Sequence, residues 1–382
     1  MKPDFDVIIC GAGPAGCTAA LALGSSGLKI ALIDKNRFPR EKICGDAIPA
    51  FVPKVLSTIN PEYAKAFGGL AEKNKVNTCR IVAPGKKSLD LKFQEYGYIC
   101  RRIVFDGFLF DLACQLPNIT IFRETAVTDV SGSTDEILIR TNNTPDLKAQ
   151  LVIGCDGASS LIRKYLTGTE INFSHCSSAV RAYFKNVTGT PPGTFELHFL
   201  RDLLPGYFWI FPLYDNHYNV GLGMPSASVT GDKTDLRKEL LRIIEKVPYI
   251  SQRFLKAELT SEIRGSLLPL WTRKNPVSGN RLMLCGDAAS LINPASGAGI
   301  GQAMQSGRFA GWQALKCFEK NDFSAKYLKN YDNTIREKLW KENRQHLLLR
   351  ELVLKNAWIF NSFVSAGQKN KSISNMILQH LG

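Results

Sequence analysis

A glycine-rich turn near the start of the sequence constrains the fold more than any other feature. Its three glycines are Gly11, Gly13 and Gly16. In the pattern Gly-x-Gly-x-x-Gly the first glycine permits a tight turn, the second lets a pyrophosphate approach the backbone, and the third lets a helix pack closely on a strand. Here the turn follows a β-branched run that ends at Cys10 and precedes an Ala- and Leu-rich segment, 15–23, which predicts a helix.

The residues after this helix complete a βαβ unit. An apolar run, 28–33, ends on Asp34, whose carboxylate is placed to accept hydrogen bonds from ribose hydroxyls. Two more short apolar runs, 151–155 and 281–285, are of the kind that a parallel sheet buries on both faces. The sequence therefore predicts an α/β fold with a doubly wound, Rossmann-like sheet that binds a dinucleotide.

Strands of a different kind lie between these runs. Segments 194–200, 207–213 and 218–224 predict an antiparallel meander, and 76–82 with 88–93 predicts a hairpin in the same sheet. We therefore expect a discontinuous nucleotide-binding domain with an inserted, mainly antiparallel β substrate domain. The expected cofactor domain comprises 1–75, 98–173 and 264–322, the expected substrate domain comprises 76–97 and 174–263, and 323–382 form a C-terminal helical tail.

The composition excludes a disordered or fibrous protein, because 45% of the 382 residues are hydrophobic and the chain is long enough for about two to three domains. Ten cysteines without a C-x-x-C pair indicate reduced, mostly buried thiols and a cytoplasmic location. The apolar stretch 7–23 is broken by glycines and is shorter than the roughly 20 residues of a spanning helix. We expect no transmembrane segment, no export signal and, from the spacing of the histidines, no metal site.

The formal charge of +14 favours anionic ligands or surfaces. Ten Lys or Arg stand against four Asp or Glu in 326–382, a net charge of +6 on a segment with helical periodicity. Two interpretations of this tail stay open: a helix lying on a membrane surface, which would make the protein peripheral to the membrane, or a helix packed on its own domain. The residues behind the first are Leu348, Leu352, Ile359 and Phe363, with Arg344, Arg350 and Lys355 nearby. No nucleic-acid recognition motif accompanies the charge, so we expect no nucleic-acid partner.

A second glycine-rich segment distinguishes between dinucleotides. It follows the run 281–285 and leads into a predicted helix, through Gly286, Asp287, Pro294, Gly297, Gly299 and Ile300. A carboxylate here is suited to hold ribityl hydroxyls, and a helix N-terminus offers amide donors to the N1–C2=O edge of a reduced flavin. Both features favour FAD over NAD. The alternative is a helix capped by Asn293 or Ser296 beside incidental glycines.

These segments resemble the p-hydroxybenzoate hydroxylase-like flavoproteins. The stretch Gly154-Cys155-Asp156-Gly157 with Ser160 and Arg163 resembles their middle fingerprint, 285–299 resembles their third, and Arg102-x-x-Phe105-Asp106 resembles a helix start whose arginine lies near the cofactor. The resemblance implies bound FAD. The residues expected to contact it are Gly11, Ala12, Gly13, Pro14, Ala15, Gly16, Asp34, Lys35, Cys44, Gly45, Arg102, Val127, Asp156, Gly157, Gly286, Asp287, Pro294, Gly297, Gly299 and Ile300.

Two stretches are similar to the geranylgeranyl reductase branch of that superfamily. Residues 39–46, PREKICGD, resemble the signature P-R-x-K-x-C-G-(D/G), and 207–212, YFWIFP, resemble the substrate-site motif Y-x-W-x-F-P. Members of this branch reduce isolated double bonds in prenyl chains, so the resemblance implies a prenyl lipid substrate. The residues implied in binding it are Tyr207, Trp209, Phe211 and Pro212, and those implied in catalysis are Cys44, Tyr207 and Trp209.

The residues themselves support these implications only in part. Period-two alternation places Tyr207, Trp209 and Phe211 on one face of a strand, where aromatic rings line either an apolar cavity or an ordinary core. The basic residues before Cys44 favour its thiolate, whereas a buried, inert cysteine is the alternative.

We expect reduced FAD to give a hydride from N5 to one alkene carbon while Cys44, Tyr207 or water protonates the other. The electron donor, NAD(P)H, a quinol or ferredoxin as a redox partner protein, stays open. Alternative functions are an NAD(P)H- and dioxygen-dependent aromatic monooxygenase or a flavin electron-transfer protein at a membrane. A halogenase is disfavoured because the sequence has no W-x-W-x-I-P stretch.

Overall fold

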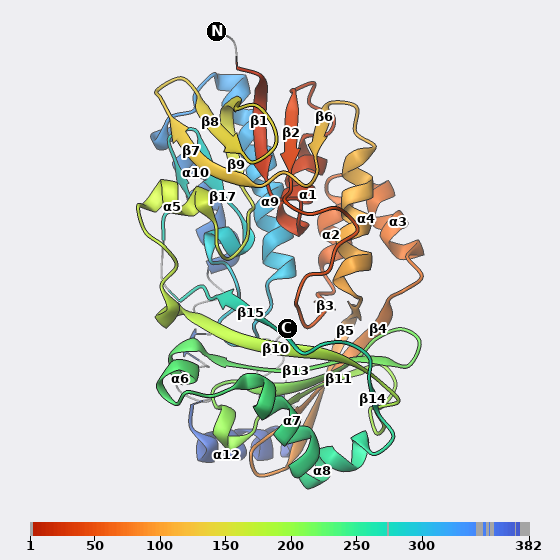
Figure 1. Cartoon of the computed structure of the whole chain (residues 1–382). Coiled ribbons are helices and arrows are strands. Elements are labelled where there is room, and N and C mark those ends of the chain that lie inside the picture. The colour runs from red at the N-terminus through yellow and green to blue at the C-terminus, as the bar shows by residue number, and fades with distance from the viewer. Residues whose placement is uncertain are drawn as a thin grey trace.

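The computed structural model describes residues 3–272, 275–340, 347–348, 351, 355–370 and 372–374. Two β-sheets lie one above the other, and the chain passes between them several times (Figure 1). The upper sheet contains the N-terminal strand, and the lower sheet contains most of the green and orange strands. This arrangement is the expected α/β fold with a second, mainly antiparallel sheet.

The upper sheet has eight strands in the order β16-β17-β9-β1-β2-β6, with β8 paired to β9 and β7 paired to β8. Its central pairs, from β17 to β6, are parallel, as expected for strands buried on both faces. The strands are β1 (Phe5–Cys10), β2 (Ile30–Ile33), β6 (Ile119–Phe122), β7 (Val127–Gly132), β8 (Ile137–Thr141), β9 (Leu147–Gly154), β16 (Ser278–Gly279) and β17 (Leu282–Leu284).

The lower sheet has nine strands in the order β14-β10-β13-β12-β11-β4-β5-β3, with β15 also paired to β10. Every pair is antiparallel except β4 with β11, which is parallel. The strands are β3 (Ala47–Ile48), β4 (Asn74–Val82), β5 (Ser88–Ile99), β10 (Cys176–Lys185), β11 (Thr194–His198), β12 (Tyr207–Pro212), β13 (His217–Pro225), β14 (Glu258–Leu259) and β15 (Arg264–Pro269).

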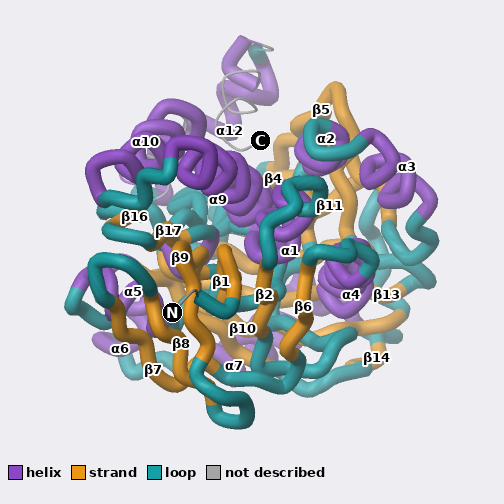
Figure 2. The backbone as a smooth tube through the Cα atoms, turned by 90° about the horizontal axis from the view of Figure 1, so that it is seen from above, coloured by secondary structure: helices purple, strands orange, loops and turns teal. Residues whose placement is uncertain are grey.

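The helices cover both sheets (Figures 1 and 2). Helix α1 packs against α9 and α4 beside the upper sheet, and α7 packs on β10 and β13 of the lower one. The helices are α1 (Pro14–Leu23), α2 (Val52–Ser57), α3 (Pro61–Gly69), α4 (Arg102–Cys114), α5 (Leu161–Thr167), α6 (Ser226–Gly231), α7 (Leu236–Lys246), α8 (Pro248–Ser251), α9 (Ile300–Lys320), α10 (Ala325–Ile335) and α12 (Ala357–Lys369). None of the helices in the described part of the chain is long and apolar enough to cross a membrane.

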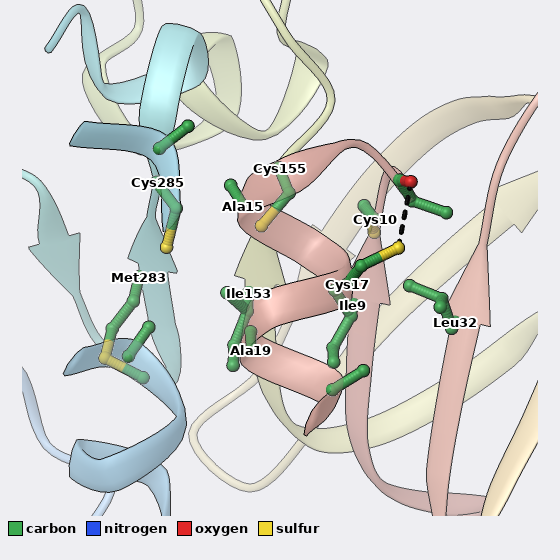
Figure 3. Packing of buried hydrophobic residues seen from close by; sticks show 14 of the residues in the cluster. Ile9, Cys10, Ala15, Cys17, Ala19, Leu32, Ile153, Cys155, Met283 and Cys285 are labelled. Carbon is green, nitrogen blue, oxygen red and sulfur yellow. Dashed lines mark hydrogen bonds between the residues drawn. The ribbon is translucent and has the colours of Figure 1, made fainter. Parts of the chain in front are cut away.

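Helix α1 is buried along its whole length, which explains its run of Ala, Leu and Cys. Figure 3 shows Cys17 and Ala19 of this helix among side chains of β1, β2 and β9. The Cys17 thiol donates a hydrogen bond of 3.1 Å to the carbonyl of Ala12, and burial raises the pKa of this thiol well above its ordinary value. All ten cysteines lie in the described residues and are free thiols, most of them buried.

Two segments lie in a different sheet from the one that their expected domain implied. Strand β15 pairs with β10 and strand β3 pairs with β5, so both belong to the lower sheet although 264–322 and 1–75 were expected in the cofactor domain. Helix α12 of the tail packs on β5. Local sequence shows that a segment is a strand, but the sheet it joins depends on residues far away in the chain.

Candidate active site

A cavity of about 950 Å³ lies between the two sheets. Its walls include the glycine-rich turn after β1, the loop from Asp34 to Gly45, the start of α9 and the face of the lower sheet that points toward the upper one. The cavity therefore joins the predicted nucleotide site to the predicted aromatic strand.

The glycine-rich turn has the geometry that its pattern predicts. Gly11 has a φ of +101°, and a Cβ there would lie 2.3 Å from the carbonyl oxygen of Cys155. A Cβ on Gly16 would lie 1.8 Å from the carbonyl oxygen of Gly11. At Gly13 the nearest atom would be the Arg40 Nη2, at 3.4 Å, so this glycine leaves room on the cavity side. The turn fits the pyrophosphate of a dinucleotide.

Asp34 stands at the end of β2 and lines the cavity. Its Oδ2 accepts a hydrogen bond of 2.8 Å from the Ala12 amide, and its Oδ1 accepts from the backbone amide of Asn36 at 2.8 Å and from the side-chain amide of Asn36 at 3.0 Å. These bonds hold the carboxylate in place beside the turn, in the position from which a ribose hydroxyl is bound.

Two helices begin at the cavity without a side-chain cap. Helix α1 starts after Gly13 and helix α9 starts after Gly299, and these glycines have no side chain that could accept a hydrogen bond from the first amides of the helix. Asn293 does not cap α9, because its Oδ1 accepts from the amides of Ala295 and Ser296 in the preceding turn. Both helix N-termini are thus available to anionic groups in the cavity, such as a pyrophosphate or a reduced flavin.

A buried ion-pair cluster supports the loop beside the turn. Arg102 forms a two-pronged pair with Asp106, at 2.6 and 2.7 Å, and Arg40 approaches the same carboxylate at 3.0 Å. Burial opposes the charge of Arg102, but Asp106 and the neighbouring Cys44 more than offset it and raise the pKa of Arg102 above its ordinary value. Arg102 therefore keeps its charge next to Cys44 at the cavity wall.

The aromatic face of β12 forms the opposite wall. Tyr207, Trp209 and Phe211 all line the cavity, whereas Phe208 and Ile210 point into the core on the other side of the sheet. Phe211 contacts Phe195 of β11 edge to face, with ring centroids 5.5 Å apart. The alternation expected from the sequence is confirmed, and the rings face a cavity as well as a core.

Tyr207 joins this wall to the start of α9. Its hydroxyl donates a hydrogen bond to the carbonyl of Ser296, and a Cβ on Gly297 would lie 3.2 Å from the hydroxyl oxygen. Burial raises the pKa of Tyr207 above its ordinary value, so this group is a phenol at neutral pH.

A hydrogen-bond network connects the cysteine loop to the lower sheet. Asn219 of β13 donates to Oδ2 of Asp46 and to the carbonyl of Cys44, both at 2.7 Å, and accepts from Nε1 of Trp209 at 2.9 Å. The Tyr183 hydroxyl also donates to Oδ2 of Asp46, at 2.9 Å. Burial raises the pKa of Asp46 to about 6.

Most of the site residues expected from the sequence come together at this cavity. They are Gly11, Gly13, Pro14, Ala15, Asp34, Lys35, Cys44, Gly45, Arg102, Val127, Asp156, Gly157, Tyr207, Trp209, Phe211, Gly286, Asp287, Pro294, Gly297, Gly299 and Ile300. Three residues do not line it. Ala12 and Gly16 shape the turn from behind, and Pro212 lies on the opposite face of β12, because successive side chains of a strand alternate.

Several cavity residues come from distant parts of the chain and could not be predicted from the sequence. Phe93 of β5, Val76 and Cys79 of β4, and Leu197 of β11 complete the apolar wall. No local pattern marks them, since each lies in a strand with ordinary alternation. Asp46 carried a signal, because it ends the stretch 39–46 that resembles the reductase branch.

Comparison with known proteins identifies the family. A family model described as an FAD binding domain matches residues 71–344, and a second model with the same description matches residues 6–40. The chain belongs to the FAD-binding domain family. The chain is an FAD-dependent oxidoreductase.

Curated relatives of this FAD-binding chain share one name. The digeranylgeranylglycerophospholipid reductase of Methanocella arvoryzae is 26% identical over 369 residues, which cover 93% of this chain and 88% of the relative. The protein of the same name from Thermoplasma acidophilum is 28% identical over 359 residues, covering 91% of this chain and 87% of the relative.

Solved structures of other proteins show the same fold. A geranylgeranyl bacteriochlorophyll reductase-like protein from Thermoplasma acidophilum has a TM-score of 0.82 at 26% identity and covers 94% of this chain and 90% of its own. The flavin-dependent brominase Bmp2 has a TM-score of 0.79 at 17% identity, covering 99% of this chain and 93% of its own, which is a likeness of fold. In the described residues of this chain, no three His, Cys, Asp or Glu side chains are grouped to hold a metal ion.

Proposed function

We propose that the protein reduces carbon–carbon double bonds in the prenyl chain of a lipid. The observation that carries this proposal is the aromatic wall of Tyr207, Trp209 and Phe211, which faces the FAD site across one continuous cavity. The names of the curated relatives and of the similar solved structure support the same substrate class. An apolar chain is the ligand that such a wall binds, because it offers large apolar area and no free polar group.

The polar atoms of this wall are already engaged within the protein. Nε1 of Trp209 donates to Asn219, and the Tyr207 hydroxyl donates to the Ser296 carbonyl. We therefore assign binding and positioning roles to both rings. The division of the chain into a cofactor domain, a substrate domain and a helical tail is part of this proposal, with β3 and β15 now counted in the substrate domain.

When bound, reduced FAD supplies the hydride that one alkene carbon receives. The other alkene carbon needs a proton, and we assign its delivery to Cys44. This residue lines the cavity between the FAD site and the aromatic wall, and Asn219 holds its backbone carbonyl at 2.7 Å. The charge of Arg102 beside it stabilises the thiolate that remains after the proton has left.

The same observations support a division of the FAD contacts. Gly11, Gly13 and the start of α1 hold the pyrophosphate, Asp34 holds a ribose, and Asp287 with the start of α9 holds the ribityl chain and flavin edge. We leave NAD(P)H and a ferredoxin-type redox partner as the two electron donors to be compared.

Anaerobic turnover tests this function. The FAD-loaded protein is reduced with dithionite and mixed with a geranylgeranyl lipid, and flavin reoxidation is followed together with the mass of the lipid. We expect each reduced double bond to add the mass of two hydrogen atoms. If the reduced protein leaves every prenyl compound unchanged, the assignment is wrong. Phenol-stimulated NAD(P)H consumption in air, with a hydroxylated product, would instead indicate a monooxygenase.

A further inference from the structure

Two arginines lie directly opposite each other where the cavity reaches the surface. Arg181 of β10 and Arg264 of β15 are register partners in an antiparallel pair, and both line the cavity. Like charges at opposite positions on neighbouring strands destabilise a sheet, so the arginine pair needs an explanation other than sheet stability. Lys42 of the cysteine loop also lines the cavity and adds a third cation; it directly follows Glu41, which pairs with Arg181.

The acidic partners of these arginines do not use all of the hydrogen-bond donors that the two guanidinium groups offer. Arg181 pairs with Glu41 at 2.9 Å, and Arg264 pairs with Glu262 at 3.0 Å. Both carboxylates are open to water, with 41% and 78% of their side chains exposed. Lys42 forms no salt bridge with any residue that the structure describes.

Arg181 also has an unsatisfied donor. Its side chain is only 3% exposed, and its Nε has no hydrogen-bond partner in the protein. The guanidinium lies 4.0 Å above the ring of Tyr183, whose other neighbour is Arg101 at 4.7 Å. A buried N–H without a partner is costly, and a ligand oxygen at this position removes the cost.

From the arginine pair inward, the cavity-facing residues of β10 and β15 are uncharged. Arg264 is exposed, Ser266 and Leu268 are half-buried, and Leu268 lies beside the position where a Cβ on Gly297 would stand, 3.9 Å away. On β10, the inward order from Arg181 is Ala179 and Ser177, which also line the cavity. Since strands rise about 3.3 Å per residue, the arginine pair lies about 13 Å along the sheet from Leu268.

We propose that Lys42, Arg181 and Arg264 bind a phosphate ester at the entrance of the cavity. Guanidinium groups bind phosphate oxygens through paired, charge-assisted hydrogen bonds, and the ammonium of Lys42 supplies a further charge. Two ligands of the proposed function carry such a group: a prenyl substrate with a phosphate head, and NAD(P)H as electron donor. The choice between them rests on the proposed function, but the phosphate chemistry does not.

Steady-state and rapid kinetics of Arg264→Gln distinguish the two ligands. The substrates are geranylgeranyl diphosphate and its neutral counterpart geranylgeraniol, and NAD(P)H is tested separately by anaerobic flavin reduction without a prenyl compound. Arg242→Gln is the control, because Arg242 is an equally exposed, carboxylate-paired arginine on α7, outside the cavity. Loss of one charge-assisted contact should raise KM about tenfold. If KM rises for the diphosphate alone, the site binds the head of the substrate. A similar rise for NAD(P)H alone assigns it to the donor.

Unchanged constants for all three compounds would overturn the phosphate site, and so would weaker FAD binding as the only effect. Lys42→Gln should reproduce the result of Arg264→Gln, which separates lost binding from lost folding. Calorimetric titration of the FAD-loaded protein with inorganic pyrophosphate tests the site without turnover. If Arg264→Gln weakens the binding of pyrophosphate and Arg242→Gln does not, the site is supported even when no prenyl compound is reduced.

Discussion

Asn219 donates a hydrogen bond of 2.7 Å to the carboxylate of Asp46, and both residues are fully buried. Asn219 belongs to the lower sheet, whereas Asp46 follows Cys44 and Gly45 in the loop that borders the cavity. The same amide reaches the Cys44 carbonyl and the same side chain accepts from Trp209. One asparagine thus fixes the relative positions of the cysteine and the aromatic wall.

The raised pKa of Asp46 makes stability depend on pH. Since its pKa is about 6 in the folded protein and 3.8 in the unfolded chain, folding favours the protonated carboxyl. That contribution is complete below pH about 4 and is lost as the pH rises through about 6. Facing the carboxyl are the hydroxyl of Tyr183, the amide of Asn219 and the more distant charges of Arg181 and Arg102, which all favour ionisation and reduce the shift.

We expect Asp46→Asn to remove this dependence. The variant keeps an oxygen to accept from Tyr183 and Asn219 but does not ionise, so its stability relative to the wild type should rise by up to about 3 kcal/mol between pH 4 and pH 8. Denaturant unfolding at several pH values measures this difference. Parallel pH profiles for the two proteins would show that folding does not shift the pKa of Asp46.

The glycines of the turn should separate folding from cofactor binding. A methyl group on Gly16 would overlap the Gly11 carbonyl, so Gly16→Ala should prevent the native packing of α1. A methyl group on Gly13 meets only the end of Arg40 and occupies cavity space. We expect Gly13→Ala to fold but to bind FAD about tenfold or more weakly, because overpacking costs about 1–3 kcal/mol. Circular dichroism and flavin titration check the pair, and equal FAD affinity in Gly13→Ala and wild type would place the pyrophosphate elsewhere.

The glycine-rich turn could be predicted from the sequence, whereas the hydrogen-bond network of Asp46 could not. Gly11, Gly13, Gly16 and Asp34 lie within one βαβ unit, so a local pattern with a known geometry was sufficient. Asp46 and Asn219 are 173 positions apart and meet only because β13 crosses under the cysteine loop. No periodicity in either segment encodes that contact.

The same limit applies to the tail but not to the aromatic strand. Alternation placed Tyr207, Trp209 and Phe211 together and also put Pro212 on the other face, where the structure has it. Whether α12 packs on its own domain depends on Phe360 and Val364, which are buried against the lower sheet. Of the residues behind the membrane interpretation, Leu352, Arg344 and Arg350 lie outside the described residues, and Ile359 is exposed.

Gly45 is close to the aromatic wall, and its substitution should narrow the cavity. A Cβ there would lie 3.2 Å from the ring of Phe211, so the ring must move by a few tenths of an ångström. We expect Gly45→Ala to raise the KM for a prenyl substrate about fivefold with unchanged FAD content, within the usual cost of overpacking. Gly68→Ala is the control, because a Cβ at Gly68 meets no atom within 4 Å. Loss of FAD without a change in KM would make Gly45 a cofactor contact only.

Arg253 stabilises the lower sheet from the face that points away from the cavity. It pairs with Glu196 through two contacts of 2.7 Å, and Glu196 is 2% exposed. Burial opposes the charge of Glu196, but hydrogen bonds from His198 and Arg253 dominate and lower its pKa to about 2. We expect Arg253→Ala to cost about 3–5 kcal/mol of unfolding free energy, because a buried carboxylate loses its partner.

The activity of correctly folded Arg253→Ala, normalised to bound FAD, should equal that of the wild type, since Glu196 and His198 alternate with the cavity residues Phe195 and Leu197. Arg242→Ala, which removes an exposed pair with Glu239, should cost no more than about 1 kcal/mol. A large loss of activity per bound FAD in Arg253→Ala would link this cluster to the cavity.

Helix α12 offers a buried and an exposed aromatic residue within one turn. Phe360 is 3% exposed and packs edge to face on Phe199, with ring centroids 4.6 Å apart, and Phe199 in turn contacts Tyr207. Trp358 is 76% exposed. Phe360→Ala should therefore destabilise the protein by about 3–5 kcal/mol, as expected for a deleted core ring, while Trp358→Ala should leave its stability nearly unchanged.

The two variants also test peripheral contact with a membrane, which is one of the two interpretations of the basic tail. An exposed tryptophan beside basic residues inserts at the lipid interface, so Trp358→Ala should reduce co-sedimentation with vesicles that contain anionic phospholipid. Vesicles of neutral phosphatidylcholine control for charge, and thermal unfolding controls for folding. If Trp358→Ala co-sediments as well as the wild type does, the exposed side of α12 does not carry the contact and the tail serves the lower sheet alone.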